Sequence, residues 1–120
     1  MEELTQKPGV QRLMVATLGR IDIVNLAHLV RIEAQSNYSK LIFEDGRELL
    51  VAKVLKKFEE QLDNTLFIRT HKTHLVNLRF IKSYEGIENK SVVLANGENI
   101  AVSRSKQHRV MRQLMSLQAV

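Results

Sequence analysis

The chain has 120 residues, of which 18 are Lys or Arg, 13 are Asp or Glu and none is Cys. This length is expected to form a single domain, and the absence of Cys excludes disulfides, thiolate metal sites and a cysteine nucleophile. The longest apolar runs fall far short of the ~20 residues that cross a bilayer, and the opening sequence MEEL lacks the basic stretch of a signal peptide. We therefore expect a cytoplasmic protein with no membrane segment in these residues.

The N-terminal quarter is predicted to lead from a linker into strands. Residues 1–10 are polar and contain the only Pro, which predicts an N-terminal linker followed by one domain over 11–117. Alternating apolar and β-branched residues predict a hairpin over 12–24 that turns at Gly19. A further strand is expected over 27–34, with even-numbered side chains on one face and odd-numbered side chains on the other.

The next segments are predicted from turn signals and periodicity. Residues 36–38 interrupt the alternation and are expected to form a loop before a strand over 40–44. The Asp-Gly pair at 45–46 predicts a tight hairpin into a strand over 48–51. Apolar residues then recur with helical period opposite charged ones, which predicts a short amphipathic helix over about 53–62.

The C-terminal half contains a second tight-turn signal, the Asn-Gly pair at 96–97, and Ser103 is placed to cap the start of a final helix. The other predicted elements are strands over 66–70, 80–85, 91–94 and 99–102, a turn or 3₁₀ segment over 75–77, and a helix over about 105–117. The chain is therefore predicted to form a mostly β domain of about ten short strands in hairpins, with two helices.

The positive charge is concentrated in one half of the chain. Residues 1–64 hold 9 Lys or Arg and 10 Asp or Glu, whereas residues 65–120 hold 9 and 3. Much of the excess lies in two clusters, over 69–74 and over 104–112. Either cluster alone is as readily explained by a solvent-exposed face as by a ligand. Two clusters without an intervening acidic run favour a surface that binds a polyanion.

Catalytic and metal-binding interpretations are weak. His71 and His74 have the HxxH spacing of some zinc sites, but they follow a predicted strand, where residues three apart point to opposite faces. Ser103 and Ser105 lie near His108 without a GxSxG context, and Ser at a helix start is most often a cap. No glycine-rich phosphate loop occurs in the sequence. We expect no enzymatic activity, no metal and no cofactor.

The sequence also narrows the kind of nucleic acid that could bind. Its six Phe and Tyr residues, mostly at predicted core positions, are too few for a base-stacking RNA module. The two predicted helices are too far apart in the chain for a helix-turn-helix. Duplex DNA would therefore be read by loops or strand ends.

Ordered motifs at consistent spacing carry a family resemblance. The stretch FIRTHKTHLVN over 67–77, the Asn-Gly turn at 96–97 and IAVSR over 100–104 resemble the LytTR DNA-binding domain of LytR/AlgR/AgrA-type response regulators. The resemblance extends over about residues 10–115. Within these motifs, Thr-His replaces a small hydroxyl residue followed by an aromatic one, and Ala replaces a common Pro.

The resemblance implies an elongated β-β-β fold whose loops enter the grooves of duplex DNA. It places base contacts at Asn37, Ser39, Lys72 and Arg104. Arg can donate two hydrogen bonds to guanine, which makes Arg104 the best candidate for sequence specificity. Four nearby side chains are expected to contact the DNA backbone: Lys40, His71, Lys106 and Arg109.

We therefore expect a sequence-specific duplex DNA-binding domain of a bacterial two-component response regulator. Arg69 and His71 alternate with Lys72, so they are also expected to face inward and hold their loop, and Asn77 is expected to bond the local backbone. The resemblance further implies a receiver domain in the full-length protein and a homodimer on promoter direct repeats. The alternative is a protein-interaction or anti-regulator module that has kept the fold without DNA affinity.

Overall fold

The computed structural model describes residues 12–117, so the predicted linker over 1–10 lies outside the described residues. The strands are β1 (Arg12–Thr17), β2 (Arg20–Asn25), β3 (Leu29–Gln35), β4 (Tyr38–Phe43), β5 (Glu48–Val51), β6 (Phe67–His71), β7 (His74–Asn77), β8 (Ile81–Glu85), β9 (Ser91–Leu94) and β10 (Asn99–Ala101). The helices are α1 (Leu55–Gln61) and α2 (Gln107–Met115), with 3₁₀ turns η1 (Leu26–His28), η2 (Leu78–Phe80) and η3 (Arg104–Lys106). The predicted mostly β fold is confirmed.

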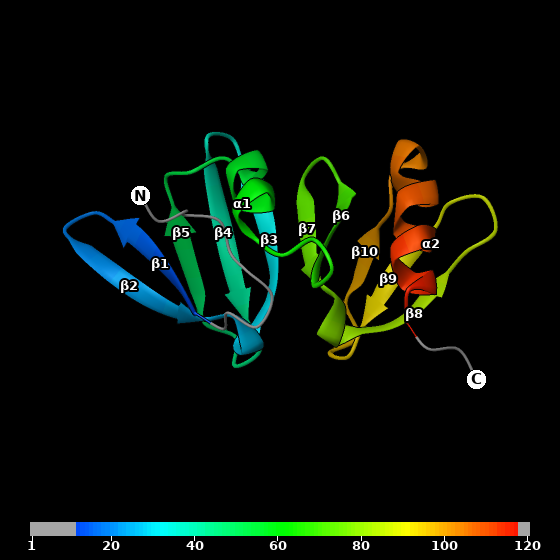
Figure 1. The fold of residues 1–120 in the computed structure, drawn as a ribbon, viewed down its shortest axis with the longest axis horizontal. Helices are drawn as coiled ribbons and strands as arrows, with labels where there is room; N and C mark the ends of the chain where they lie inside the picture. The colour runs from blue at the N-terminus through cyan, green and yellow to red at the C-terminus, as the bar shows by residue number, and fades with distance from the viewer. Residues whose placement is uncertain (1–11, 118–120) are drawn as a thin grey trace.

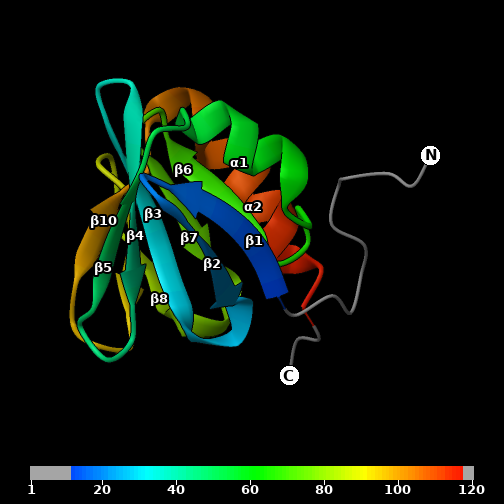
Figure 2. The ribbon, with the colours of Figure 1, turned by 90° about the vertical axis from the view of Figure 1, so that its left-hand side faces the viewer.

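The strands form three antiparallel sheets that follow one another along the long axis of the molecule (Figure 1). The β1–β2 hairpin stands at one end, the central sheet has the order β5-β4-β3-β7-β6, and the C-terminal sheet has the order β10-β9-β8. The Cα trace measures 46 × 29 × 27 Å, in agreement with the predicted elongated shape. Figure 2 shows that α1 and α2 lie on the same side of the molecule.

The central sheet is covered by a hydrophobic core on each face. One core joins it to the β1–β2 hairpin and to α1, where Phe58 is fully buried. The other core joins it to the C-terminal sheet and to α2, where Val110 is fully buried. Strands buried on both faces carry apolar residues at successive positions, which is why β7 contains the adjacent buried residues Leu75 and Val76.

The alternation predicted over 27–34 is wrong for Leu29 and Val30 and holds from Arg31 to Ala34, because β3 contains a β-bulge. Its pairing with β4 shifts between Leu29 and Arg31, which makes Val30 the extra residue. Leu29 and Ile32 pack in the core beneath α1, whereas Val30 packs in the core shared with the C-terminal sheet. The bulge therefore breaks the period of two and also directs Arg31 toward the C-terminal sheet.

The structure differs from two other local predictions. Residues 75–77 form strand β7 instead of a turn or 3₁₀ segment, because Leu75 and Val76 are buried in opposite cores, and the 3₁₀ turn follows at η2. Ser103 stands at the N-cap of η3 without a side-chain cap hydrogen bond. Its backbone N–H instead donates to the Thr70 carbonyl at 2.8 Å, which attaches the start of the C-terminal helix to β6.

Asn77 connects backbone segments that are distant in sequence. Its side chain is buried, and its Nδ2 donates to the carbonyls of Leu26 at 3.2 Å and Leu29 at 2.8 Å. Its Oδ1 accepts from the backbone N–H of Arg79 at 2.9 Å, which confirms the predicted local bond. One amide thus holds the end of β7 against the start of β3.

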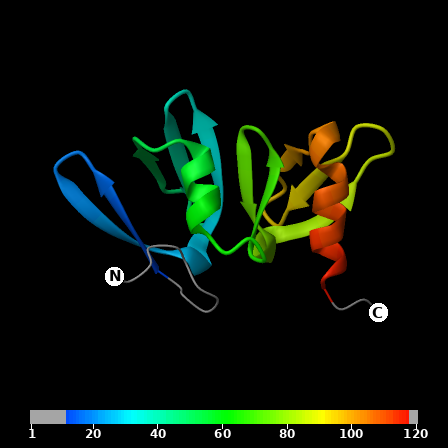
Figure 3. The same cartoon turned by 45° about the horizontal axis from the view of Figure 1, so that its top comes forward.

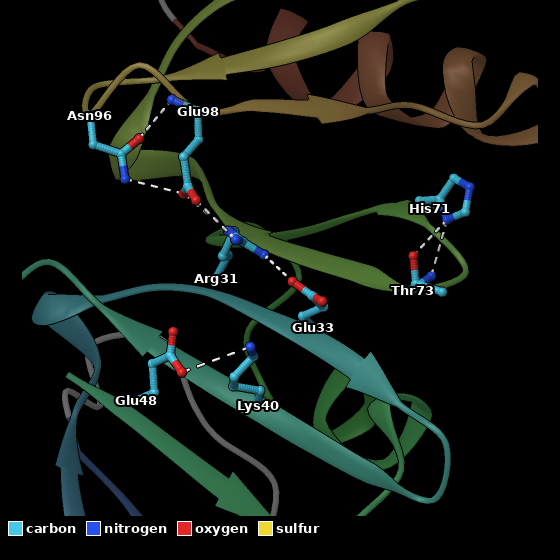
Figure 4. A network of polar contacts seen from close by, with 8 residues as sticks. All are labelled: Arg31, Glu33, Lys40, Glu48, His71, Thr73, Asn96 and Glu98. Carbon is cyan, nitrogen blue, oxygen red and sulfur yellow. Dashed lines mark hydrogen bonds and ion pairs between the residues drawn. The ribbon is translucent and has the colours of Figure 1, made fainter. Parts of the chain in front are cut away.

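Arg31 links the central sheet to the C-terminal sheet through a set of ion pairs that we call the clasp, formed by Arg31, Glu33 and Glu98 (Figure 4). The Arg31 side chain is largely buried and contacts Glu98 twice, through Nε at 3.1 Å and Nη2 at 3.0 Å. Its Nη1 donates to Glu33 at 2.8 Å. Asn96 Nδ2 also donates to Glu98, at 3.1 Å.

The clasp changes the acid–base behaviour of the groups around it. Hydrogen bonds from Arg31 hold the pKa of Glu33 and of Glu98 below the usual range. Burial lowers the pKa of His74 on the neighbouring strand, and the charge of Arg31 lowers it further. His74 Nδ1 is buried without a hydrogen-bond partner, so the neutral ring is the favoured form.

We expect the free energy of unfolding to fall as pH decreases from about 7.5 to 5, because the unfolded chain protonates His74 near pH 6.5 while the folded chain resists it. Below about pH 4.5 the stability contributed by Glu33 and Glu98 is lost in turn, as pH falls through their lowered folded pKa values. Urea unfolding measured across this range should show a flatter slope between pH 7.5 and 5 in His74→Gln. An identical slope in the variant would show that His74 is not the source of this pH dependence.

Replacing Asn77 by Ala is expected to lower the free energy of unfolding by about 2 to 3 kcal/mol, because buried backbone groups lose their hydrogen-bond partners. Thermal or urea unfolding measures the change. Asn99→Ala is the matched control, since Asn99 is an exposed residue of β10 and its loss should be close to neutral. Equal stability of the two variants would show that the Asn77 bonds contribute little.

Candidate nucleic-acid interface

Three connections lie along one long edge of the molecule, the upper edge in Figure 1, which comes forward in Figure 3. They are the β3–β4 turn, the β6–β7 turn and η3, where the chain passes from β10 into α2. These connections contain or adjoin the segments for which the sequence predicts contacts with DNA bases. The fold therefore brings three separate parts of the sequence to a common edge.

The β3–β4 turn is tighter than predicted. Gln35 pairs with Tyr38, so the loop expected over 36–38 is a two-residue turn made by Ser36 and Asn37. Ser36 adopts the left-handed conformation with φ of 58°, which satisfies the geometry of a short hairpin connection. Asn37 is exposed at its tip.

Ser39, predicted as a base contact, is instead a buried residue of β4. Its side chain is fully buried, and its hydroxyl donates to the Lys53 carbonyl at 2.6 Å. In an alternating strand the side chain next to an exposed position points inward, and Tyr38 takes the exposed position. Ser39 attaches β4 to the segment that follows β5, and its burial does not fit contact with a base.

The β6–β7 turn is held from behind by Arg69. Its guanidinium donates to the carbonyls of His71 at 2.8 Å and Lys72 at 2.6 Å, and to the Glu59 carboxylate of α1 at 2.6 Å. The predicted structural role of Arg69 is confirmed. Lys72 is exposed at the tip of the turn, so the backbone of the turn is fixed while its cationic side chain is free to meet a ligand.

His71 is partly exposed beside this turn and has a defined orientation. The backbone N–H of Thr73 donates to His71 Nδ1 at 3.2 Å, and the Thr73 hydroxyl lies 2.9 Å from the same nitrogen (Figure 4). Because Nδ1 accepts a backbone hydrogen bond, the neutral ring carries its proton on Nε2. His71 thus both supports the turn and offers an N–H donor on its other side.

Arg104 is exposed in η3 beside a shallow depression of about 380 Å³. The depression is bordered by the β6–β7 turn, the β8–β9 loop and the start of α2; its lining residues are His71, Glu88, Asn89, Lys90, Ala101, Val102, Ser103, Arg104 and Gln107. Its walls carry cationic and amide groups together with one carboxylate. Hydrogen-bond donors and acceptors in one recess are suited to a polar anionic ligand.

Sequence reasoning missed the β8–β9 loop. Lys90 lines the depression, and its Nζ donates to the Gly86 carbonyl at 3.2 Å and lies 5.7 Å from the centre of the Tyr84 ring. No side chain fits at Gly86, since a Cβ there would lie 2.2 Å from the Asn89 carbonyl oxygen. Gly86 and Lys90, on either side of Ile-Glu-Asn between two predicted strands, were the available sequence signal for this loop.

The four predicted backbone contacts have different surroundings. Lys106 is partly exposed in η3, and Arg109 is exposed on α2 with one nitrogen 4.0 Å from Glu59. Lys40 lies within strand β4 and points toward Glu48, at 3.8 Å (Figure 4). The structure therefore places His71, Lys106 and Arg109 near Arg104 or on the helix that follows it, and sets Lys40 apart from them.

Residues 12–117 contain no group of three or more His, Asp or Glu side chains arranged to hold a metal ion. None of the helices described in this range is long and apolar enough to cross a membrane.

Comparisons with known proteins agree with this geometry. The family model of the LytTr DNA-binding domain matches residues 19–115. A solved LytTr DNA-binding domain from a putative methyl-accepting/DNA response regulator of Bacillus cereus superposes with a TM-score of 0.75 at 23% identity, covering 88% of this chain and 98% of that one.

Two curated relatives carry a similar sequence, the heme-containing CO-sensing transcriptional regulators RcoM 1 and RcoM 2 of Paraburkholderia xenovorans (strain LB400). Each is 27% identical over 105 residues, which cover 82% of this chain and 39% of the relative, so the chain spans well under half the length of these proteins. Because the family model covers most of the chain, the protein belongs to the LytTr DNA-binding domain family, the DNA-binding module of response regulators and other transcriptional regulators.

Proposed function

We propose that this domain binds duplex DNA sequence-specifically through the edge formed by the β3–β4 turn, the β6–β7 turn and η3. The supporting observation is that all three connections reach the same edge with Asn37, Lys72 and Arg104 exposed on them. Buried partners behind the turns hold the backbone, so the exposed side chains can meet base edges in the grooves without reorganising the fold.

The long dimension of the molecule sets how it meets DNA. The Cα trace extends 46 Å, whereas one turn of B-DNA rises about 34 to 36 Å. Contacts at well-separated points of the edge therefore fall in successive grooves, with phosphates between them. We assign base contacts to Asn37, Lys72 and Arg104, and backbone contacts to His71, Lys106 and Arg109. Lys40 is a more peripheral backbone contact.

The proposal extends to the full-length protein and to its assembly on DNA. We infer that it serves a cytoplasmic two-component response regulator whose receiver domain lies elsewhere in the protein, and that two copies occupy promoter direct repeats as a homodimer. The short span of the chain relative to its curated relatives is consistent with a domain that works beside another one. No catalytic step is involved, because binding alone performs the task.

Arg104→Ala is expected to reduce the preference for the best duplex over a scrambled one by about 10-fold, because a bidentate contact to guanine supplies roughly 1 to 3 kcal/mol of discrimination. The best duplex is first selected from a random pool, and binding is measured by fluorescence anisotropy. Arg112→Ala is the control, since Arg112 is exposed farther along α2. Equal loss of affinity for the two duplexes would contradict a sequence-specific contact by Arg104.

Lys106→Ala is expected to weaken binding to selected and scrambled duplexes alike, because a phosphate contact carries no sequence information. The slope of log K against log salt should become less steep by about 1, the counterion released by one phosphate contact. Arg79→Ala, on the exposed η2 turn at the opposite edge, should leave the slope unchanged. Absence of binding to any duplex by the unmodified chain would favour the protein-interaction alternative.

A further inference from the structure

The C-terminal sheet is attached to the central sheet by polar contacts at two opposite ends. Near the proposed DNA edge, the Ser103 N–H donates to the Thr70 carbonyl of β6. At the other end, Glu98 in the β9–β10 turn binds Arg31 of β3 (Figure 4). In Figure 4 the turn carrying Asn96 and Glu98 lies at the opposite end from the His71–Thr73 turn. Between the two attachments, the sheets meet through apolar side chains.

We propose that Arg31 is a positioning residue for DNA recognition, which through Glu98 sets the angle between the two sheets and hence the separation of the DNA-contacting turns. This inference rests on the proposed function. Arg31 touches no DNA itself. It acts on the β8–β9 loop and η3, which the C-terminal sheet carries, relative to the β3–β4 turn, which the central sheet carries.

The apolar contacts alone do not define this angle. Hydrophobic contact is non-directional, so it does not by itself select one orientation of the two sheets. An Arg that donates two parallel hydrogen bonds to one carboxylate fixes both distance and orientation. Glu33, also on β3, accepts a hydrogen bond from Arg31 at 2.8 Å, so the guanidinium that bridges the two sheets is held in a fixed orientation.

Local features of β3 and of the β9–β10 turn orient the side chains of the clasp toward each other. The bulge at Val30 directs the Arg31 side chain out of the central sheet. On the other side, Asn96 Oδ1 accepts from the Glu98 N–H at 2.9 Å while its Nδ2 donates to the Glu98 carboxylate, which orients the carboxylate toward Arg31. Removing the charge of Glu98 should therefore free the angle while leaving both cores intact.

The angle matters because DNA grooves repeat at a fixed interval. Each base pair advances the helix by about 3.4 Å, so a shift of that size between turns in different grooves moves one of them onto the wrong pair. A braced angle makes the domain sensitive to the spacing of its recognition bases. A loose angle permits binding to several spacings with less discrimination.

The absence of Cys allows a direct measurement of the angle. Spin labels placed at Leu50→Cys in β5 and Lys82→Cys in β8, both exposed strand positions outside the proposed DNA contacts, report the distance between the two sheets by double electron–electron resonance. We expect a narrow distance distribution in the parent chain and a broad or shifted one in Glu98→Gln and in Arg31→Met. A distribution that stays narrow and unshifted in both variants would overturn the inference.

Val15→Ala separates the clasp from general loss of stability. Val15 is buried in the other core, on the β1–β2 hairpin, so this variant should melt at a lower temperature and keep the narrow distribution. Arg31→Lys keeps the charge but loses the paired geometry, and should give an intermediate distribution. Broadening in Val15→Ala equal to that in Glu98→Gln would assign the effect to stability and overturn the positioning role.

The second readout uses unlabelled protein and the duplex selected from the random pool, compared with the same duplex carrying one inserted base pair between its recognition bases. Glu98→Gln should reduce the discrimination between these two duplexes by about 10-fold, the size of one mismatched pair. Undiminished discrimination despite a broadened distance would overturn the link to DNA. Failure of the parent chain to bind any duplex would overturn the proposed function, and the positioning role with it, whatever the distance measurement shows.

Discussion

Burial of both faces of the central sheet is the constraint on which the rest of the structure depends. One face requires α1 and the β1–β2 hairpin, and the other requires the C-terminal sheet and α2. Because β3, β6 and β7 each contribute residues to both cores, these three adjoining strands hold the two halves of the domain together. The bulge at Val30 lets one strand present apolar groups to both sides and still direct Arg31 toward Glu98.

Rigid support behind the turns is the second common feature. Arg69 binds two carbonyls of the β6–β7 turn and a carboxylate of α1, and Ser39 ties β4 to the backbone after β5. Ser39 and Arg69 are hydrogen-bonded to the protein, whereas Asn37 and Lys72 are exposed on the turns. A turn fixed in this way can present Lys72 or Asn37 without paying the ordering entropy at the moment of binding.

The comparisons show what the fold tolerates. At 23% identity the Bacillus cereus domain superposes over nearly its whole length. Sequences this different share a backbone when the core positions and turn geometries are kept. Exposed side chains on the turns do not take part in this packing, so the shared backbone does not fix their identity.

The sequence by itself determined the mostly β architecture, α1, the tight turns and the basic second half, because these depend on local periodicity, turn chemistry and charge. It also identified Arg69 and Asn77 as residues that hold the backbone. Only the tertiary structure decided the strand identity of 75–77, the burial of Ser39 and the pairing of Arg31 with Glu98, 67 positions away in the chain. These features depend on which surfaces meet across the sheets. A β-bulge, or a second core on the other face, changes the side to which a residue points, and neither produces a periodic pattern of apolar residues in the sequence.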